Sequence, residues 1–541
     1  MMKRMIRHIL LLFVGMSSLA AACTENGDLP VSPGTDPDPF EPVPGGETVM
    51  SIEAVDPERI ARVIGPTPAG ENLPNPNNTM YRFGFGSTDY GNMWDAGNGR
   101  LWCIFGDNFD DRGGSWRSNA IAVSADLSLE DGLYYYDVIR DADGRMMEPI
   151  VSRAKTGQYP DGSEYEVTCI PTGGFSAPVA GGHRQYVNYM SIRQWNTDGN
   201  DMWSVNYSEL VWSDDDGKSW TRSGVKWPSY SNFVQVAYVK RGDTLYMYGT
   251  PAGRKGNVYL AKVALGDVLD RAAYVYWNGG GWSSSEAEAV AVANGTVSEM
   301  SVRYNSYYKR YIMMYLSVNQ RKVVYRDALS PEGEWSAEKI LLTDGYAPYI
   351  HPWFCDGRDL WFVLSSVDRK PSASYDTWHI HLYRAKLRED AEGFNMIWEA
   401  GFENEPNESI AYRTLWNCPL STSTRDCHGG KIACKTVNNA DGEWKDSCTQ
   451  TVKVHKNTDY VLTAWAKASV AGHRGAYLGV RLADGRICDD NPALGPDEWT
   501  QIRVEFNSGD NTTLDVFFGT WGAQGLYVVA DDFAMTPKTM E

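Results

Sequence analysis

Residues 88–109 read TDYGNMWDAGNGRLWCIFGDNF, two apolar and aromatic runs on either side of a short polar turn. Such runs around a turn predict two neighbouring buried strands. Asp89 comes just before the first run, and Asp107 comes just after the second. Two carboxylates at the ends of adjacent strands can face one pocket. The alternative is that both cap turns, since Asp beside Gly often bonds its own backbone.

Similar strand and turn units recur from about residue 80 to residue 390. Their aromatic strands are 101–105, 185–190, 244–248, 310–315 and 359–364. Repetition of such units predicts an all-β architecture with a five-bladed β-propeller, and a pair of β-sandwiches is the rival. We place the propeller at residues 49–396.

The composition agrees with β-structure and narrows the class of ligand. The 541 residues include 20 Trp, 31 Tyr and 52 Gly, and 22% of them are charged. Abundant aromatics and glycines are typical of an all-β chain. The net charge of −19 argues against nucleic acid, because phosphate binding needs a basic surface. An acidic chain rich in aromatics suits carbohydrate, so we expect a monomer with a polysaccharide partner.

The first 48 residues indicate an exported protein. Residues 1–22 have an early basic cluster, an apolar run and small residues before Cys23, as in a secretory signal. The end of this segment resembles a bacterial lipobox. We therefore expect a lipidated Cys23, followed by a disordered Pro-rich tether over residues 23–48. This predicts a lipoprotein of the outer membrane, exposed at the cell surface and held by its lipid. An ordinary signal peptide with an incidental Cys is the alternative.

Residues 213–220, SDDDGKSW, resemble the Asp-box pattern Ser-x-Asp-x-Gly-x-x-Trp of sialidase-like propellers. In those propellers the motif is a structural turn of a hairpin and takes no part in catalysis. We therefore expect Asp215 and Trp220 to stabilise a hairpin.

Residues 80–390 as a whole resemble the endo-D-arabinanases of glycoside hydrolase family 183, formerly a domain of unknown function. The resemblance rests on segments 87–89, 102–107, 298–305 and 375–385. It implies a hydrolase that cleaves α-D-arabinofuranosyl linkages in the arabinan of mycobacterial-type arabinogalactan or lipoarabinomannan, with no cofactor required for catalysis. Asp89 and Asp107 match the family's catalytic pair in kind and spacing.

Glycoside hydrolysis needs one carboxylic acid to protonate the leaving oxygen and one carboxylate to activate water or attack. We expect inversion at the anomeric carbon. The sequence leaves open which Asp is the acid. The apolar strand before Asp107 favours Asp107, because burial raises a carboxyl pKa. The alternatives are a glycosidase acting on another furanoside polymer and a non-catalytic, glycan-binding surface lipoprotein.

Further polar residues lie at or near the starts of predicted inner strands, which face the central channel of a propeller. We interpret five of them as substrate-binding candidates: Asp95, Asn188, Gln235, Glu299 and His351. Glu299 could hold a sugar hydroxyl or raise a neighbouring carboxyl pKa through its like charge, and a structural Glu is the alternative. For His351 the alternative is a core histidine.

From residue 397 onward the pattern changes. Segments 400–403, 457–468, 498–500 and 527–533 resemble, in order, the landmarks of jelly-roll carbohydrate-binding modules. We therefore predict a β-sandwich (jelly roll) over residues 397–541. In that fold the opening Glu and the closing Asp pair often hold a structural calcium through hard oxygen ligands. The matching positions are Glu403, Asp531 and Asp532.

The same region holds further candidates for binding and cross-linking. Four tryptophans could stack on sugars, with a core position favoured for the third: Trp416, Trp444, Trp465 and Trp521. Five cysteines allow up to two disulfides in an exported chain, and their pairing stays open: Cys418, Cys427, Cys434, Cys448 and Cys488.

Overall fold

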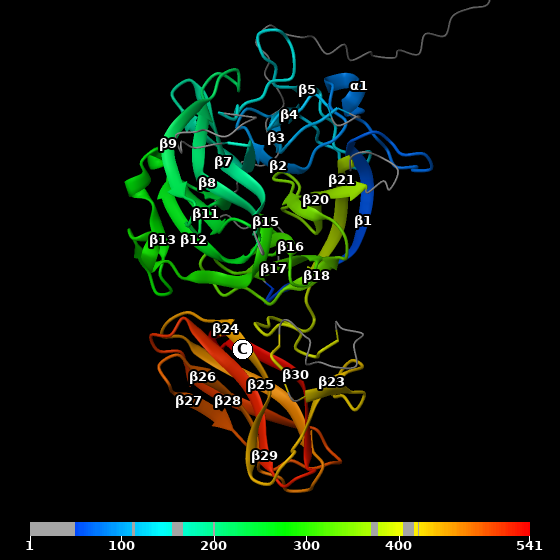
Figure 1. The fold of residues 1–541 in the computed structure, drawn as a ribbon, viewed down its shortest axis with the longest axis vertical. Helices are drawn as coiled ribbons and strands as arrows, with labels where there is room; N and C mark the ends of the chain where they lie inside the picture. The colour runs from blue at the N-terminus through cyan, green and yellow to red at the C-terminus, as the bar shows by residue number, and fades with distance from the viewer. Residues whose placement is uncertain are drawn as a thin grey trace, which may run out of the picture.

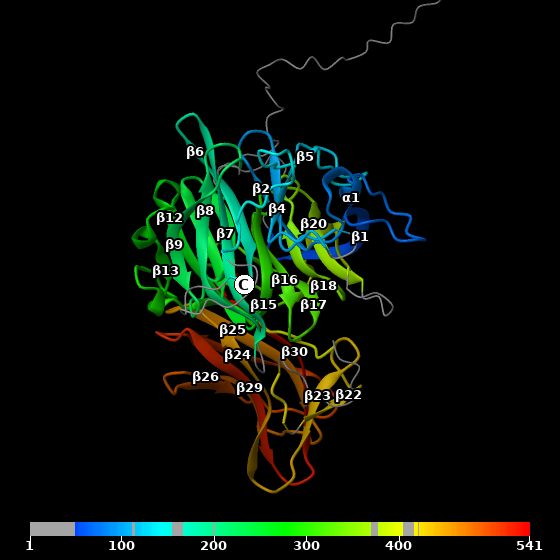
Figure 2. The same ribbon diagram turned by 45° about the horizontal axis from the view of Figure 1, so that its top comes forward.

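The computed structural model describes residues 49–110, 114–153, 166–197, 201–368, 377–403, 416–419 and 421–540. These residues form an all-β chain, a β-propeller followed by a β-sandwich, as the sequence predicts (Figure 1). Figure 2 shows the two parts from a second direction, with the sandwich still packed against one side of the propeller. Cys23, the signal segment and the tether lie outside the described residues, so lipidation and the outer-membrane location stay predictions.

The first two propeller sheets are antiparallel meanders in chain order. The first contains β2 (Tyr90–Asp95), β3 (Leu101–Phe105), β4 (Ala120–Ser124) and β5 (Asp137–Val138). The second contains β6 (Thr168–Val179), β7 (Gly182–Thr197), β8 (Asp201–Ser213) and β9 (Thr221–Pro228). Strands β2, β3 and β4 are buried almost throughout, and the sequences of β3 and β4 are nearly continuous in apolar residues.

A nine-stranded sheet follows, because β12 pairs with β15 and joins two units. Its first unit contains β10 (Gln235–Arg241), β11 (Thr244–Thr250), β12 (Gly256–Ala264), β13 (Val275–Trp277) and β14 (Trp282–Ser283). Its second contains β15 (Ala291–Asn305), β16 (Arg310–Ser317), β17 (Lys322–Ala328) and β18 (Lys339–Leu342). Since two expected blades share this sheet, the count of five blades stays a prediction.

The last propeller sheet is completed by the first strand of the chain. It contains β19 (Tyr346–Ile350), β20 (Asp359–Asp368), β21 (Thr377–Glu389) and β1 (Ile52–Ile64). Strand β1 runs antiparallel to β21, from the Ile52–Glu389 pair to the Ile64–Ile380 pair. The strands β2, β6, β10, β15 and β19 contact one another in a closed ring around the propeller axis. Side chains at the ends of these strands are therefore brought together.

The Asp-box hairpin has the predicted structural role. The Asp215 carboxylate accepts the backbone N–H and the hydroxyl of Ser219 at 2.9 and 2.6 Å. The Trp220 Nε1–H donates to the Gly217 carbonyl at 3.0 Å, and its ring lies 6.4 Å from that of Trp102. The motif thus fixes the β8–β9 turn against the neighbouring sheet.

The sandwich consists of two sheets packed face to face. One contains β22 (Ser421–Thr424), β23 (Ala433–Val437), β30 (Tyr527–Pro537), β25 (Asp459–Ala468) and β28 (Thr500–Asn507). The other contains β24 (Glu443–Lys453), β29 (Thr513–Gly522), β26 (Ala476–Leu482) and β27 (Ile487–Asp490). Trp416 is 1% exposed within their common core, so its predicted role in sugar stacking is wrong.

Polar and aromatic contacts join the sandwich to the propeller. The Tyr460 hydroxyl donates to the Glu334 carboxylate, and the rings of His455 and Trp277 lie 5.6 Å apart. Helices are short in the described residues: α1 (Thr79–Phe83), η1 (Leu265–Asp267), η2 (Arg271–Ala273), η3 (Glu286–Glu288) and η5 (Lys538–Met540). None of the helices in this part of the chain has the length and apolar character needed to cross a membrane.

A buried ion pair beside the closing strand gives a test of the fold. Arg310 and Asp327 are both fully buried and lie 2.7 Å apart, and the Ser51 hydroxyl donates to the same Asp327 at 2.9 Å. Asp327→Ala leaves the Arg310 charge buried without its counter-ion, so we expect a loss of about 3–5 kcal/mol in urea unfolding. Glu505→Gln is the control, because its pairs with Arg503 and Lys538 are exposed. A loss below about 1 kcal/mol for Asp327→Ala, the range of an exposed pair, would contradict this.

Candidate active site

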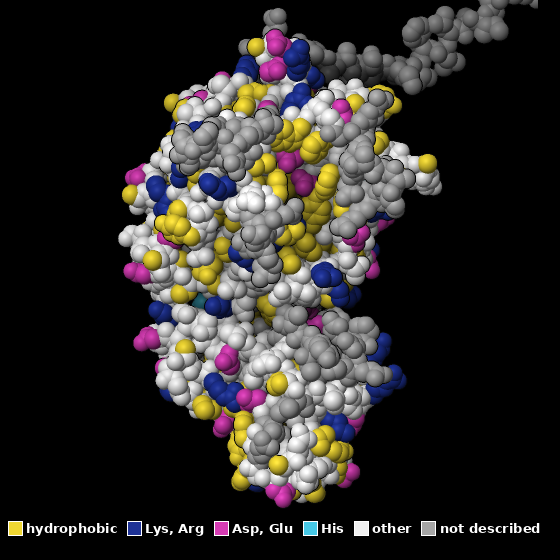
Figure 3. All heavy atoms as spheres, viewed as in Figure 1, with side chains coloured by type: hydrophobic (Ala, Val, Ile, Leu, Met, Phe, Trp, Pro, Cys, Tyr) yellow, Lys and Arg dark blue, Asp and Glu magenta, His cyan; other side chains and the backbone are white. Residues whose placement is uncertain are grey.

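The predicted carboxylates do share one pocket. Asp89 and Asp107 both line a cavity of about 650 Å³ at one end of the propeller axis. Figure 3 shows acidic side chains in a hollow of the propeller flanked by hydrophobic ones. The other lining residues are mostly aromatic or long: Phe109, Trp195, Met202, Trp203, Arg254, Tyr346, Val367 and Trp378. A wide cavity lined by aromatic side chains and two acids is suited to a polymeric sugar.

The position of Asp89 depends on a bulge at the start of β2. Tyr90 has φ of 73° and Gly91 has φ of 104°, and the pairing of β2 with β3 shifts between Tyr90 and Asn92. A Tyr in the left-handed region is strained, and the Tyr90 N–H is held by the Ser365 hydroxyl at 2.9 Å. A Cβ at Gly106 would lie 2.7 Å from Asp89 Oδ1. The glycine of the Phe-Gly-Asp segment therefore leaves room for the opposite carboxylate.

The surroundings of Asp89 favour its protonated form. Burial, and then repulsion from Asp107, raise the pKa of Asp89 to about 7. The Tyr346 hydroxyl donates to Asp89 Oδ2 at 2.9 Å and opposes this rise. The charge of Glu299 raises the pKa further, and that of Arg254 lowers it. Asp89 is thus a carboxyl that can carry a proton near neutral pH.

Asp107 lies among hydrogen-bond donors instead. Its Oδ1 accepts the Trp116 Nε1–H at 2.9 Å and the Thr168 hydroxyl at 2.5 Å. Donors aimed at a carboxylate stabilise the ionised form. The structure therefore favours Asp89 as the proton donor and Asp107 as the carboxylate. The sequence favoured the reverse, with Asp107 as the acid, because an apolar strand precedes it. The preceding strand is indeed buried, but Asp107 itself is only half-buried.

Glu299 lies behind the pocket and does not line it. It is 2% exposed, and its Oε1 accepts hydrogen bonds from the Tyr90 hydroxyl at 2.9 Å and from Arg254 Nη2 at 2.7 Å. Its charge raises the pKa of Asp89. This agrees with the sequence prediction that Glu299 raises a neighbouring carboxyl pKa through its like charge. Arg254, which no sequence motif marks, carries this contact into the pocket wall. Arg254 has φ of 59° and lies 5.3 Å from the Tyr346 ring.

The family model for DUF4185, a domain of unknown function, matches residues 74–381. The chain belongs to the DUF4185 family. The family's description assigns no activity, so the resemblance to endo-D-arabinanases stays a prediction. No curated protein matches the sequence.

Three solved structures illustrate what this DUF4185 chain is similar to. A candidate hydrolase from Bacteroides ovatus is 16% identical, over 57% of this chain and 87% of that chain, with a TM-score of 0.41. An exo-β-1,3-galactanase from Phanerochaete chrysosporium is 10% identical, over 89% of this chain and 100% of that chain, with a TM-score of 0.38. The CBM22-1 xylan-binding domain of Paenibacillus barcinonensis Xyn10C is 18% identical, over 26% of this chain and 91% of that chain, with a TM-score of 0.20.

The other four substrate-binding candidates of this DUF4185 chain do not line the pocket. Asp95 lies at the opposite end of β2, where it accepts the Trp353 Nε1–H at 2.8 Å. Asn188 and Gln235 are buried and do not belong to the pocket wall. His351 accepts the Trp353 backbone N–H at 3.2 Å, and burial together with Arg303 lowers its pKa to about 3. Of these four residues only Gln235 begins an inner strand, β10. Asp95 ends β2, Asn188 lies within β7 and His351 follows the end of β19, so their predicted positions at strand starts are wrong.

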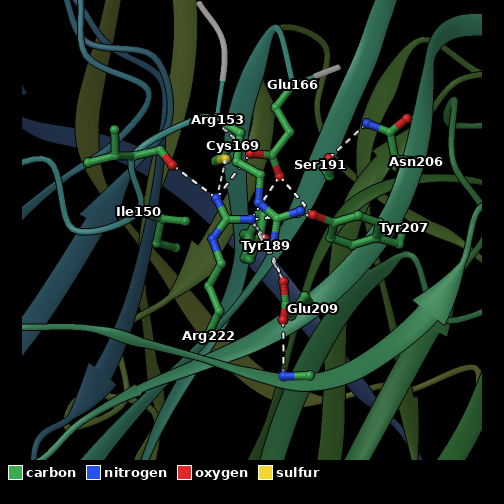
Figure 4. Close-up of polar contacts among 12 residues, drawn as sticks. Ile150, Arg153, Glu166, Cys169, Tyr189, Ser191, Asn206, Tyr207, Glu209 and Arg222 are labelled. Carbon is green, nitrogen blue, oxygen red and sulfur yellow. Dashed lines mark hydrogen bonds and ion pairs between the residues drawn. The ribbon is translucent and has the colours of Figure 1, made fainter. Parts of the chain in front are cut away.

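A partly buried charge network supports the strand that carries Thr168 (Figure 4). Arg222, from β9, donates to both oxygens of Glu166 at 2.9 and 3.0 Å and to the Val151 carbonyl at 2.9 Å. Glu166 also accepts the Arg153 backbone N–H at 2.7 Å. Burial opposes ionisation of Glu166, but these bonds outweigh it and lower the pKa. The network fixes the chain two residues before Thr168, the donor to Asp107.

Two tryptophans of the sandwich form an exposed pair that could stack on a glycan. Trp444 and Trp521 are directly opposite in β24 and β29 and are 40% and 51% exposed. A cavity of about 460 Å³ adjoins Trp521, next to His473 and Arg474. Trp465 instead stacks on His428, with ring centroids 4.1 Å apart.

The three predicted calcium ligands converge on one loop. Glu403 accepts the backbone N–H groups of Lys431 and Ile432 at 2.6 and 2.7 Å, and Asp531 accepts that of His428 at 2.7 Å. Burial and the charge of Asp532 raise the pKa of Asp531 to about 7. Carboxylates are the hard oxygen ligands that calcium takes, but in the described residues these three do not form a group with the spacing of a metal site. The calcium site therefore stays a prediction.

Calcium should therefore stabilise the sandwich. Removing divalent ions with a chelator and then adding Ca²⁺ should raise Tm, because an ion bound to the folded state alone stabilises that state. Asp532→Asn should abolish the rise, and Asp441→Asn, in the β23–β24 connection, should keep it. An identical Tm with and without Ca²⁺ would contradict the site.

Proposed function

We propose that this chain is a glycoside hydrolase in which Asp89 and Asp107 form the catalytic pair. One observation carries the proposal: a carboxyl with a pKa raised to about 7 and a carboxylate held by two donors line the same pocket. Paired carboxyl groups in opposite protonation states are the requirement of glycoside hydrolysis. The glycan-binding alternative offers no reason for this pairing.

In the proposed reaction Asp89 donates its proton to the leaving glycosidic oxygen. Asp107 accepts a proton from a water molecule that attacks the anomeric carbon from the opposite face, which inverts the configuration. Trp116 and Thr168 orient Asp107, and Tyr346 orients Asp89. The aromatic side chains of the pocket would stack on sugar rings and hold the bond between the two carboxyls.

We further propose that the substrate is a D-arabinan and that cleavage is internal. The support is the resemblance of residues 80–390 to endo-D-arabinanases, in which Asp89 and Asp107 match the catalytic pair. A pocket of about 650 Å³ with several aromatic walls can hold more than one sugar unit, as an endo-acting enzyme needs. The proposed partner is therefore an α-D-arabinofuranosyl polymer, and the enzyme acts on it without a catalytic metal.

The proposal predicts the behaviour of isosteric variants. Asp89→Asn and Asp107→Asn keep the side-chain shape but remove proton transfer. We therefore expect kcat/KM to fall by about a hundredfold to ten-thousandfold, or more. Folding, measured by circular dichroism, should survive. Asp243→Asn, on an exposed turn of the same propeller, is the control. Activity is measured on a panel of D- and L-arabinans with mass analysis of the products.

The possible results test the catalytic residues, the substrate and the stereochemistry separately. Near-normal turnover by either variant removes that residue from the mechanism. Cleavage of another furanoside polymer with D-arabinan intact rejects the substrate and keeps the reaction. Proton NMR of the first product should show the inverted anomer, and a retained anomer would make one carboxylate a nucleophile. Binding without cleavage of any glycan would favour the non-catalytic alternative.

The pH profile gives a second test. Because Asp89 must be protonated, activity should fall as the pH rises through about 7. The Tyr346 hydroxyl stabilises the ionised form of Asp89, so Tyr346→Phe raises the pKa and should move the alkaline limb to higher pH. Tyr230→Phe, at an 86% exposed position, should leave the profile unchanged. An alkaline limb that moves to lower pH in Tyr346→Phe would reject Asp89 as the acid.

A further inference from the structure

Three cysteines meet in the core of the sandwich, far from the proposed catalytic pair in the chain. The Sγ atoms of Cys418, Cys434 and Cys448 all lie within 4.8 Å of one another. The three residues are 0%, 1% and 0% exposed. Among the described residues, no other group of three or more His, Cys, Asp or Glu side chains has ligand atoms close enough together to hold a metal ion.

The cluster connects the two sheets of the sandwich. Cys434 belongs to β23 and pairs with Ala530 in one sheet. Cys448 belongs to β24 and pairs with Phe518 in the other sheet, directly after a register shift between Asp446 and Cys448. Cys418 comes from the segment before β22. Three separate segments thus direct their thiols to one point between the sheets.

The geometry suits a metal–thiolate centre. For three sulfurs within 4.8 Å of one another, some point lies within about 2.8 Å of all three, and a Zn–S bond is about 2.3 Å long. Inward movements of about 0.5 Å or less per sulfur would complete the bonds. A β-bulge such as the one before Cys448 re-aims a side chain, and here it turns the thiol toward its two partners.

We propose that Cys418, Cys434 and Cys448 form a binding site for a thiophilic divalent ion of the Zn²⁺ type. Three thiols give up their protons to one ion: M²⁺ and three R–SH give [M(SR)₃]⁻ and three H⁺. No oxidant or reductant takes part. Soft thiolate ligands select such ions over Ca²⁺ or Mg²⁺. The ion links the two sheets, and its charge offsets that of the thiolates in an apolar core.

Burial raises the pKa of the Cys448 thiol well above its usual range, and the neighbouring Cys418 and Cys434 add to the effect. Ion binding must displace their protons, so affinity should fall as the pH falls. This links the proposed site to a measurable release of acid.

The test uses the full chain, freed of metals and kept reduced with a phosphine. With Ca²⁺ present to fill the predicted carboxylate site, titration with Cd²⁺, and separately with Zn²⁺, should saturate at one further ion per chain and raise Tm. Cd²⁺ should produce the ultraviolet charge-transfer band of cadmium thiolate. In weakly buffered solution about three protons should be released per ion, as the balance above requires.

Matched variants separate this centre from other cysteines. Cys448→Ala should lose the charge-transfer band and the rise in Tm, and Cys418→Ala repeats the test on a loop residue if β24 does not tolerate the change. Cys427→Ser is the control, because Cys427 lies near the carboxylates of Asp531 and Glu403 and is the competing place for Cd²⁺. Cys488→Ser, in β27, is a second control.

The proposal is overturned if wild-type protein binds Cd²⁺ without a thiolate band or without proton release. It is also overturned if Cys448→Ala or Cys418→Ala binds the ion as wild type does. A disulfide between two of the three cysteines in protein isolated without reductant, found by peptide mass mapping, would reject a resident ion as well.

Discussion

The pairing of β1 with β21 is the constraint on which the propeller depends. It joins the first and the last strands of a domain of more than three hundred residues, so its formation closes a long loop of chain at a cost in entropy. Three register shifts along the pair let β1 bend around the edge of the propeller. Once it is in place, β19 lies beside β2 and the inner ring is closed.

The proposed acid lies at this seam. The Tyr90 N–H, next to Asp89, is held by Ser365 of β20 at 2.9 Å, and the Trp378 N–H donates to the Ser87 hydroxyl at 2.9 Å. Tyr346, the hydrogen-bond partner of Asp89, begins β19. The position and the pKa of Asp89 therefore depend on the contact between the last sheet and the first. A chain with an open ring would lose the site together with the fold.

Local sequence predicted what local physics decides. The apolar runs around Gly97 and Gly99 predicted β2 and β3, and the Asp residues at their outer ends predicted the shared pocket. The Asp box predicted the β8–β9 turn. The protonation state of Asp89 was not predictable, because it comes mainly from burial in the assembled propeller and from the charge of Asp107. The donors to Asp107 were not predictable either, because Trp116 lies in the following loop and Thr168 in the next sheet. A short segment reveals whether an Asp follows an apolar strand, and it does not reveal which donors reach that Asp.

The residues of the pocket wall were harder still to predict. Arg254 lies in a turn, and no pattern in the sequence marks it as the partner of Glu299. Asp95 ends β2, Asn188 lies within β7, Gln235 begins β10 and His351 follows β19, whereas Glu299 lies within β15. Their depths along the propeller axis therefore differ. Depth depends on the register of each strand in its sheet and on bulges such as that at Tyr90. Register is set by the packing of whole sheets.

The two carboxyls also constrain each other during the proposed reaction. Repulsion from Asp107 helps to keep the proton on Asp89, and this repulsion would oppose loss of that proton if Asp107 stayed charged. In an inverting displacement Asp107 gains a proton from water while Asp89 loses its own. The pair therefore carries one negative charge before and after the step, so repulsion raises the pKa of the acid without opposing the proton transfer. The pair must titrate as a unit, and the buried Glu299 charge, offset by Arg254 at 2.7 Å, adjusts this balance from behind the pocket.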